Sequence, residues 1–236
     1  MNLEIKALSK KYGEKQVLED FSCSFGEGIT GVLGPNGAGK STLMGLIADV
    51  VKRDGGQILY DGLDIIELGK KYRSILGYMP QEQGLYDDLS GKAFLMYMAQ
   101  LKGVKRKEAN DKVNELLELV SLKNVSNRKL GTYSGGMRQR ILLCQALLGK
   151  PKVIILDEPT AGMDVEERVK VAEYMKEFSK KRIVLWSTHI VSDIEYTASN
   201  ILIMKNGKNI ICATPKELLE NGRKENISQV YMEYMK

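Results

Sequence analysis

The stretch GPNGAGKS, residues 34–41, decides the fold of this chain. It contains the full pattern G-x-x-x-x-G-K-[ST], in which glycines let consecutive backbone N–H groups surround a phosphate, because no Cβ blocks the approach. In this pattern Lys40 neutralises the β- and γ-phosphates of a nucleotide, and the Ser41 hydroxyl can ligate Mg²⁺. The stretch therefore predicts a phosphate-binding loop.

The neighbouring sequence favours this interpretation over a chance match in a glycine-containing loop. An apolar run, GITGVL, precedes the loop, and a helical pattern, GKSTLMGLIADV, follows it. A strand, a glycine loop and a helix in this order are the context that the motif requires, and the helix adds the positive end of its dipole. The residues that we expect to hold the phosphates are Gly34, Pro35, Asn36, Gly37, Ala38, Gly39, Lys40, Ser41 and Thr42.

The rest of the chain predicts an α/β fold around this loop, a P-loop core with a mostly parallel sheet. Short apolar runs recur at residues 74–80, 152–159, 182–189 and 200–213. Such runs are typical of strands that are buried on both faces of a parallel sheet, and helical patterns alternate with them. The first segment, residues 2–28, alternates in polarity around the turn KYGEKQ and predicts antiparallel strands beside that sheet.

Residues 83–135 differ from the α/β pattern. The segments GKAFLMYMAQLKG and RKEANDKVNELLELVSL have helical periodicity, without a convincing strand between them. We interpret this region as a helical insertion. The sequence has no repeat, no low-complexity tract and no Pro/Ser linker, so we expect one domain over residues 1–236, closed by one or two short helices in residues 215–236.

The composition limits the class of protein. The 236 residues carry 35 Lys and Arg against 30 Asp and Glu, and this net charge of +5 permits an acidic partner or an anionic membrane surface without favouring either. The three isolated cysteines, Cys23, Cys144 and Cys212, suit a reducing compartment. No signal peptide is evident, and no window approaches the roughly 18 apolar residues of a membrane-spanning helix. We therefore expect a cytosolic protein.

Two adjacent acids follow the apolar run VIIL in the segment VIILDEPT, residues 153–160. A buried strand that ends in acids places them at its carboxyl end, where ligands of α/β folds bind. Successive side chains point to opposite faces, so the two acids should have different roles. We assign Asp157 to Mg²⁺ and Glu158 to the polarisation of an attacking water. The alternative is a solvated acidic pair before Pro159.

The segment YSGGMRQR, residues 133–140, begins an amphipathic helix. Ser134 is a good N-cap, so the helix start can be explained by capping and a glycine turn. With Gly135 and Gly136, it also resembles a second phosphate-binding helix N-terminus. Two such ends can grip one nucleotide only if the fold, or a second copy, brings them face to face, and the spacing leaves both possibilities open.

Over essentially its full length, the chain resembles the nucleotide-binding subunit of ATP-binding cassette (ABC) transporters. The matching segments, in the order of the family, are GPNGAGKS as Walker A, MPQEQ as the Q-loop, YSGGMRQR as the signature, VIILDEPT as Walker B, AGMD as the D-loop and STHIVSD as the H-loop. Together they are specific, although each segment after the first would be weak alone. The resemblance implies binding of ATP and Mg²⁺, with hydrolysis of ATP coupled to transport.

The only histidine of the chain, His189, lies in the H-loop segment. A lone histidine is more often a satisfied side chain at the end of a strand. The resemblance implies instead that His189 contacts the γ-phosphate and helps to position Glu158 and the attacking water. A neutral imidazole suits this role because it can donate from one nitrogen and accept at the other.

The resemblance assigns three further residues one at a time. Tyr12 matches the aromatic residue that stacks on adenine, and is otherwise a tyrosine at a strand end. Gln81 matches the Q-loop glutamine, which reaches Mg²⁺ and the water, and is otherwise a loop amide after Pro80. Asp164 matches the D-loop aspartate at the dimer interface, and is otherwise a helix N-cap.

The resemblance also implies partners. Ser134 and Gly136 match groups that contact the γ-phosphate of the nucleotide held by the opposite subunit, so a second cassette, identical or different, should sandwich two ATP molecules. A separate transmembrane permease should dock near residues 83–97 and hold the chain at the cytoplasmic face of the cell membrane. We expect no nucleic acid as partner.

Departures from the family pattern bear on the direction of transport and on alternative functions. Met137 stands where glutamine is usual, Tyr133 where leucine is common and Val165 where proline is frequent. The methionine followed by arginine resembles cassettes that export drugs, antimicrobial peptides or ions. Soluble cassette ATPases that act on DNA or ribosomes carry long coiled coils or two cassettes, which this chain lacks. A degenerate cassette that binds ATP without hydrolysis is disfavoured by the intact Glu158 and His189.

Overall fold

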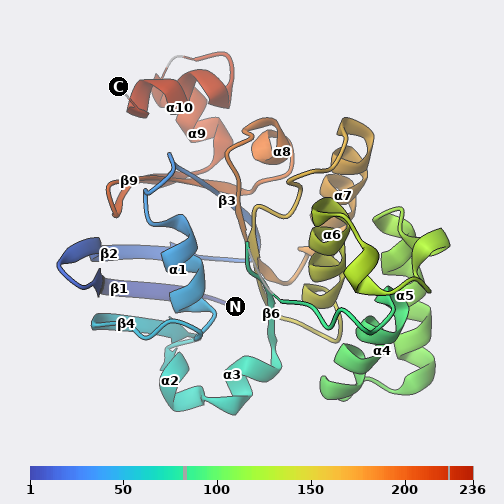
Figure 1. The fold of residues 1–236 in the computed structure, drawn as a ribbon. Helices are drawn as coiled ribbons and strands as arrows, with labels where there is room; N and C mark the ends of the chain where they lie inside the picture. The colour runs from blue at the N-terminus through green and yellow to red at the C-terminus, as the bar shows by residue number, and fades with distance from the viewer. Residues whose placement is uncertain (82–83, 223, 236) are drawn as a thin grey trace.

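The computed structural model describes residues 1–81, 84–222 and 224–235, and its strands form two sheets (Figure 1). The larger sheet has the strand order β10-β9-β3-β8-β7-β6. All its neighbouring strands are parallel except β10, which pairs with β9 as an antiparallel edge. Its strands are β3 (Gly28–Leu33), β6 (Leu76–Met79), β7 (Val153–Asp157), β8 (Ile183–Ser187), β9 (Asn200–Lys205) and β10 (Lys208–Ala213). The apolar runs of the sequence are thus the strands of this sheet, which confirms the mostly parallel α/β fold.

The smaller sheet is antiparallel, with the order β2-β1-β4-β5. Its strands are β1 (Leu3–Tyr12), β2 (Lys15–Phe25), β4 (Gly55–Tyr60) and β5 (Leu63–Asp64). The first two confirm the antiparallel segment expected before residue 28, whereas β4 and β5 were not predicted from the sequence. The turn dipeptide Asp61-Gly62, in which both residues have positive φ, was the available signal.

Two hydrophobic clusters lie on opposite faces of the larger sheet. Alternate residues of β8 divide between them: Ile183 and Leu185 join one cluster, and Val184 and Trp186 the other. The first cluster is closed by the smaller sheet and by α1 (Lys40–Ile47). The second is covered by α4 (Gly91–Leu101), α5 (Arg106–Leu119), α6 (Gly135–Ala146) and α7 (Val165–Phe178). Both faces of the sheet are therefore buried, as continuous apolar strands require.

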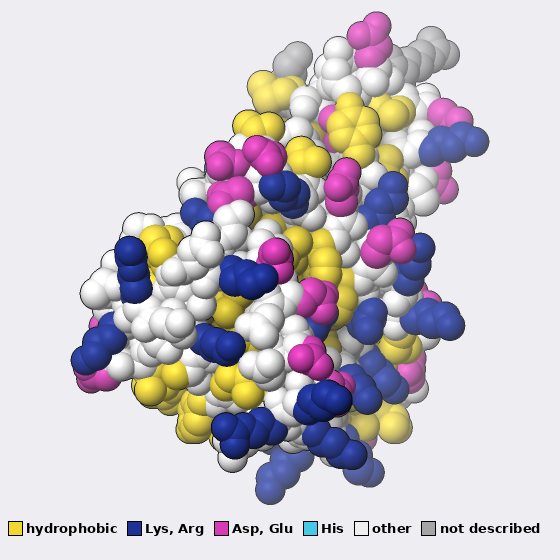
Figure 2. Space-filling view, turned by 90° about the vertical axis from the view of Figure 1, so that its right-hand side faces the viewer, with side chains coloured by type: hydrophobic (Ala, Val, Ile, Leu, Met, Phe, Trp, Pro, Cys, Tyr) yellow, Lys and Arg dark blue, Asp and Glu magenta, His cyan; other side chains and the backbone are white. Residues whose placement is uncertain are grey.

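The region predicted as a helical insertion contains α4, α5 and two short 3₁₀ helices, η1 (Lys123–Val125) and η2 (Leu130–Thr132). Its expected first residue, Gln83, lies outside the described residues, and the described part of the insertion holds no named strand. On the face that these helices form, hydrophobic side chains lie between charged ones, and lysine and arginine side chains gather toward the lower end (Figure 2).

The remaining helices are short. They are α2 (Ile65–Leu68), α3 (Lys70–Ser74), α8 (Ser192–Glu195), α9 (Pro215–Gly222) and α10 (Ile227–Met235). The last two agree with the short helices expected at residues 215–236. No helix within the described ranges is long and apolar enough to cross a membrane.

Candidate functional site

Four motif segments meet at one edge of the larger sheet. The parallel strands β3, β8, β7 and β6 are direct neighbours, so their carboxyl ends lie side by side. The phosphate-binding loop follows β3, Gln81 follows β6, Asp157 ends β7 and His189 follows β8. This is the edge at which α/β proteins bind their ligands. Segments separated by more than a hundred residues are therefore assembled into one site.

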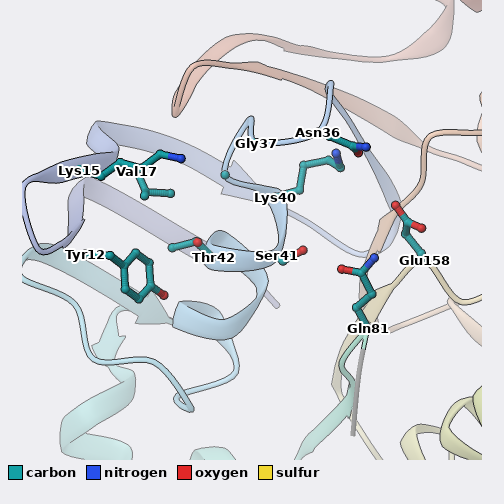
Figure 3. A pocket seen from close by; sticks show the side chains of 11 residues that line it. Tyr12, Lys15, Val17, Asn36, Gly37, Lys40, Ser41, Thr42, Gln81 and Glu158 are labelled. Atoms are coloured by element: carbon teal, nitrogen blue, oxygen red, sulfur yellow. The ribbon is translucent and has the colours of Figure 1, made fainter.

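A cavity of about 440 Å³ opens at this edge (Figure 3). It is lined by Tyr12, Lys15, Val17, Asn36, Gly37, Gly39, Lys40, Ser41, Thr42, Gln81 and Glu158. Nine of these residues were predicted from the sequence. Lys15 and Val17 were missed, although Lys15 pairs with Tyr12 in the hairpin that β1 and β2 form, and Val17 lies two residues further along β2. Gly34, Pro35 and Ala38 belong to the loop but do not line the cavity.

The phosphate-binding loop directs a helix start at the cavity. Gly39 precedes α1 with φ 97°, a conformation that favours glycine, and no side chain caps the helix. The first backbone N–H groups of α1 have no intrahelical acceptor. A Cβ at Gly34 would lie 2.6 Å from the carbonyl oxygen of Met204, so the loop also depends on glycine for its packing. The geometry suits an anion at the end of α1.

Lys40 projects from the first residue of α1 along this loop. Its Nζ donates to the carbonyl oxygens of Gly34, at 2.7 Å, and Pro35, at 3.1 Å. Burial lowers the pKa of the Lys40 ammonium, and the charges of Glu158 and Asp157 oppose that shift. The two loop carbonyl oxygens thus hold the ammonium at the phosphate-binding loop, where a phosphate can accept a hydrogen bond from it.

Asp157 is 3% exposed and ends β7 beside the loop. Its Oδ1 accepts a hydrogen bond from the hydroxyl of Ser187, at the end of β8. Mg²⁺ prefers hard oxygen ligands. This edge of the sheet offers three of them: the Asp157 carboxylate, the Ser41 hydroxyl and the Gln81 amide oxygen. The residues therefore fit a magnesium ion shared with phosphates. Ser187 was missed by the sequence analysis, although a polar residue ending a buried strand was a signal.

Glu158 has an unusual backbone conformation. Its φ is 52°, in the left-handed region, where a non-glycine residue costs about 1–3 kcal/mol and persists only when its surroundings hold it. Its N–H lies 3.1 Å from both the main-chain oxygen and the Oγ of Ser187, and its carbonyl oxygen accepts from Gln139 at 2.8 Å. Such strain is often found at functional sites.

His189 contacts the side chain of Glu158. The distance from its Nδ1 to Glu158 Oε1 is 3.2 Å, and the two side chains are 58% and 16% exposed, respectively. His189 does not itself line the cavity, so it reaches the site through Glu158. Thr188 shapes the turn at this point, because its Oγ1 accepts the N–H of Ile190 at 2.9 Å.

The signature residues lie apart from this cavity, at the start of α6. The Ser134 hydroxyl caps the helix by accepting the N–H of Met137 at 3.3 Å. Ser134 and Gly135 are exposed, and a Cβ on Gly135 would meet no atom of the described residues within 4 Å. Gly136 instead lies against Gly162, whose oxygen would be 3.2 Å from such a Cβ. The chain alone does not bring its two candidate phosphate-binding helix ends together.

Asp164 is a helix cap within this chain. It forms a capping box with Glu167: its Oδ1 accepts the N–H of Glu167 at 2.9 Å, and its own N–H lies 3.3 Å from Glu167 Oε2. Of the two interpretations from the sequence, the structure displays the N-cap of α7.

Comparisons with known proteins agree with the motif order. The family model described as ABC transporter matches residues 18–161. An uncharacterised ABC transporter ATP-binding protein of Bacillus subtilis, YxlF, is 36% identical over 207 residues, which span 87% of this chain and 68% of that protein. The linearmycin resistance ATP-binding protein LnrL of Bacillus subtilis is 34% identical over 218 residues, or 92% of this chain and 70% of that protein.

A solved structure extends the similarity to the whole fold. The ATP-binding subunit of an ABC transporter superposes with a TM-score of 0.91 at 28% sequence identity, and the match covers 100% of both chains. The helical insertion and the C-terminal helices are thus part of a shared architecture, along with the sheet that carries the site.

Proposed function

Because this chain belongs to the ABC transporter family of ATP-binding proteins, which hydrolyse ATP, we propose that the cavity at the carboxyl edge of the larger sheet is its ATPase site. The observation that carries the proposal is the convergence of Lys40, Asp157 and Glu158 at this edge, with His189 against Glu158. A cation for phosphate, an acid for Mg²⁺ and an acid for water are the parts that phosphoryl transfer needs.

Each residue has a distinct role in the proposed reaction. Lys40 and the N–H groups at the start of α1 bind the phosphates, and Tyr12 stacks on the adenine. Asp157, Ser41 and Gln81 hold Mg²⁺, which would neutralise charge on the phosphates when bound. Glu158 polarises the attacking water, and His189 orients Glu158 and contacts the γ-phosphate. Most of the catalysis comes from positioning and electrostatic stabilisation.

A second cassette completes the site in this proposal. The start of α6 is exposed, capped by Ser134 and outside the cavity of its own chain, so it is available to the nucleotide of a partner. Two copies arranged head to tail would bring the α6 end of each to the α1 end of the other, and ATP would be held between them. Binding would clamp the pair and hydrolysis would release it.

A separate transmembrane permease is the proposed membrane partner. A surface cavity of about 670 Å³, lined by Leu85, Tyr86, Asp87, Asp88, Leu89 and Tyr97, lies within the expected docking region. Tyr86 and Tyr97 are exposed there, and their rings pack edge to face. Gln83, the first residue of the docking region, lies outside the described residues. This surface would hold the chain at the cytoplasmic face of the cell membrane.

Export is the proposed direction of transport. The exchange of the usual signature glutamine for Met137 favours it, and LnrL is a linearmycin resistance protein. A drug, peptide or ion is the corresponding class of solute.

Complementation between two inactive variants tests the shared site. Glu158→Gln removes the base and leaves the start of α6 intact, whereas Ser134→Arg blocks the start of α6 and leaves the base. Each variant alone should hydrolyse little ATP. An equal mixture should recover about a quarter of the wild-type rate, because half of the dimers are mixed and each mixed dimer contains one complete site. A mixture as inactive as its components, or a wild-type rate per chain unaffected by dilution to monomers, would refute the proposal.

A further inference from the structure

Gln139 lies in α6, three residues after Gly136, and contacts the peptide group of Glu158. Its side-chain Nε2 donates to the main-chain oxygen of Glu158 at 2.8 Å. The contact joins α6 to the loop after β7, two segments that are separate in the sequence. Gln139 is half-buried and does not line the ATP cavity, and although it belongs to the signature segment YSGGMRQR, none of the roles assigned above falls to it.

The contact holds Glu158 from one side of its peptide, and Ser187 holds it from the other. Glu158 has a left-handed φ of 52°, which an acidic residue rarely adopts without support. Its N–H is anchored to Ser187 and its carbonyl oxygen to Gln139. The two anchors set the direction in which the Glu158 side chain leaves the backbone, toward His189 and the cavity.

We propose that Gln139 is a positioning residue, which keeps the Glu158 carboxylate in its place for catalysis and links it to α6. This inference rests on the proposed ATPase function. Ser134 caps the start of the same helix, and Ser134 and Gly136 face a partner's nucleotide in that proposal. Gly136 also lies against Gly162 of the loop that follows Glu158. Nucleotide bound in the partner's site would thus influence the position of Glu158 in the chain's own site, through α6 and the hydrogen bond from Gln139.

Two variants of the full chain test the positioning role. Gln139→Met has similar length without a donor, and Gln139→Glu has the same shape with acceptors only. Each should lower kcat about tenfold, because a small misplacement of a catalytic group is costly, while KM for ATP stays within about twofold. Gln57→Met, at an exposed position on β4, is the matched control. Wild-type kcat in both variants, or a loss of ATP binding in parallel with kcat, would overturn the inference.

Mixed dimers determine which site Gln139 serves. Two copies with different affinity tags are purified together in the presence of ATP, and one copy carries Glu158→Gln, so only the site with the intact base hydrolyses ATP. Placing Gln139→Met in the copy with the intact base should lower the rate about tenfold, as in the homodimer. Placing it in the other copy should leave the rate within about twofold, because that copy contributes only its α6 end to the active site.

The reverse pattern would mean that Gln139 acts on the partner's nucleotide through α6, and would overturn the positioning role. No effect in either copy would overturn it as well, while a hydrolysing mixed dimer would leave the proposed function standing. Failure of the proposed function is distinct, since wild-type copies would then form no ATP-dependent pair and show no hydrolysis that depends on protein concentration.

Discussion

Two helix starts in this chain, those of α1 and α6, follow glycine-containing segments but face different surroundings. The start of α1 has no side-chain cap and opens into the cavity of its own chain. The start of α6 is capped by Ser134 and faces outward. The helix dipole gives both of these helix starts the same positive potential. The difference shows that a helix start becomes a binding site through the groups that surround it, which α1 receives from its own chain.

The largest effect that tests this comparison is expected at α1. Lys40→Ala removes the cation that the carbonyl oxygens of Gly34 and Pro35 hold at the loop, and should lower ATP hydrolysis about a thousandfold by loss of transition-state stabilisation. ATP binding should weaken as well. Steady-state hydrolysis and equilibrium binding measure the two effects. The control is Lys52→Ala, an exposed lysine beyond the end of α1. If Lys40→Ala bound and hydrolysed ATP as the control does, the start of α1 would not be the phosphate-binding site.

A pair of glycine variants separates the two helix starts. At Gly34 an added Cβ lies 2.6 Å from the oxygen of Met204, whereas at Gly135 it meets nothing within 4 Å in the part of the chain that the structure describes. Gly34→Ala should therefore lower the melting temperature and ATP binding of the single chain. Gly135→Ala should leave both unchanged and lower hydrolysis about tenfold, since the methyl group crowds the partner's phosphate. Calorimetry of both variants measures the melting temperature and ATP binding, and a hydrolysis assay measures the rate. Full activity of Gly135→Ala would argue against a partner's nucleotide at α6.

A smaller effect is expected at the end of the cavity where Tyr12 is proposed to stack on adenine. Tyr12 is 50% exposed and lines the cavity at the end of β1. If adenine stacks on it, Tyr12→Ala should raise the Kd for ATP about tenfold, given the free energy of base–aromatic stacking. Tyr12→Phe should bind normally because it keeps the ring. Equal affinities of the alanine and phenylalanine variants would place the adenine elsewhere.

The smallest effect concerns α7, whose start is fully capped. Asp164→Ala removes one half of the capping box with Glu167 and should lower the free energy of unfolding by about 1 kcal/mol. Asp164→Asn can still cap the helix and should retain most of the stability. Denaturant unfolding of the two variants compares them. A loss of hydrolysis in Asp164→Asn at full stability would add a role at the dimer interface to the N-cap.

Much of the fold could be predicted because its signals are local. Continuous apolar runs indicated β3, β7 and β8, and the alternating segment before residue 28 indicated β1 and β2. The strand β4 was missed because its partner β1 is distant in the sequence, and β5 was missed because it has two residues and pairs with β4 alone. Lys15 and Val17 were missed for a similar reason, since only the hairpin geometry places their side chains in the cavity.

The residue types and their spacing determined by themselves that the chain has a phosphate-binding loop, an acidic strand end and a capped glycine segment. These features depend on backbone conformation within a few residues, so they can be predicted from the sequence alone. Only the tertiary structure decided which of them meet. The strand order places β3, β8, β7 and β6 side by side, and this brings Lys40, Asp157 and Glu158 together while α6 faces away. The strand order depends on how segments that are distant in the sequence pack to bury both faces of the sheet, and no single motif contains that information.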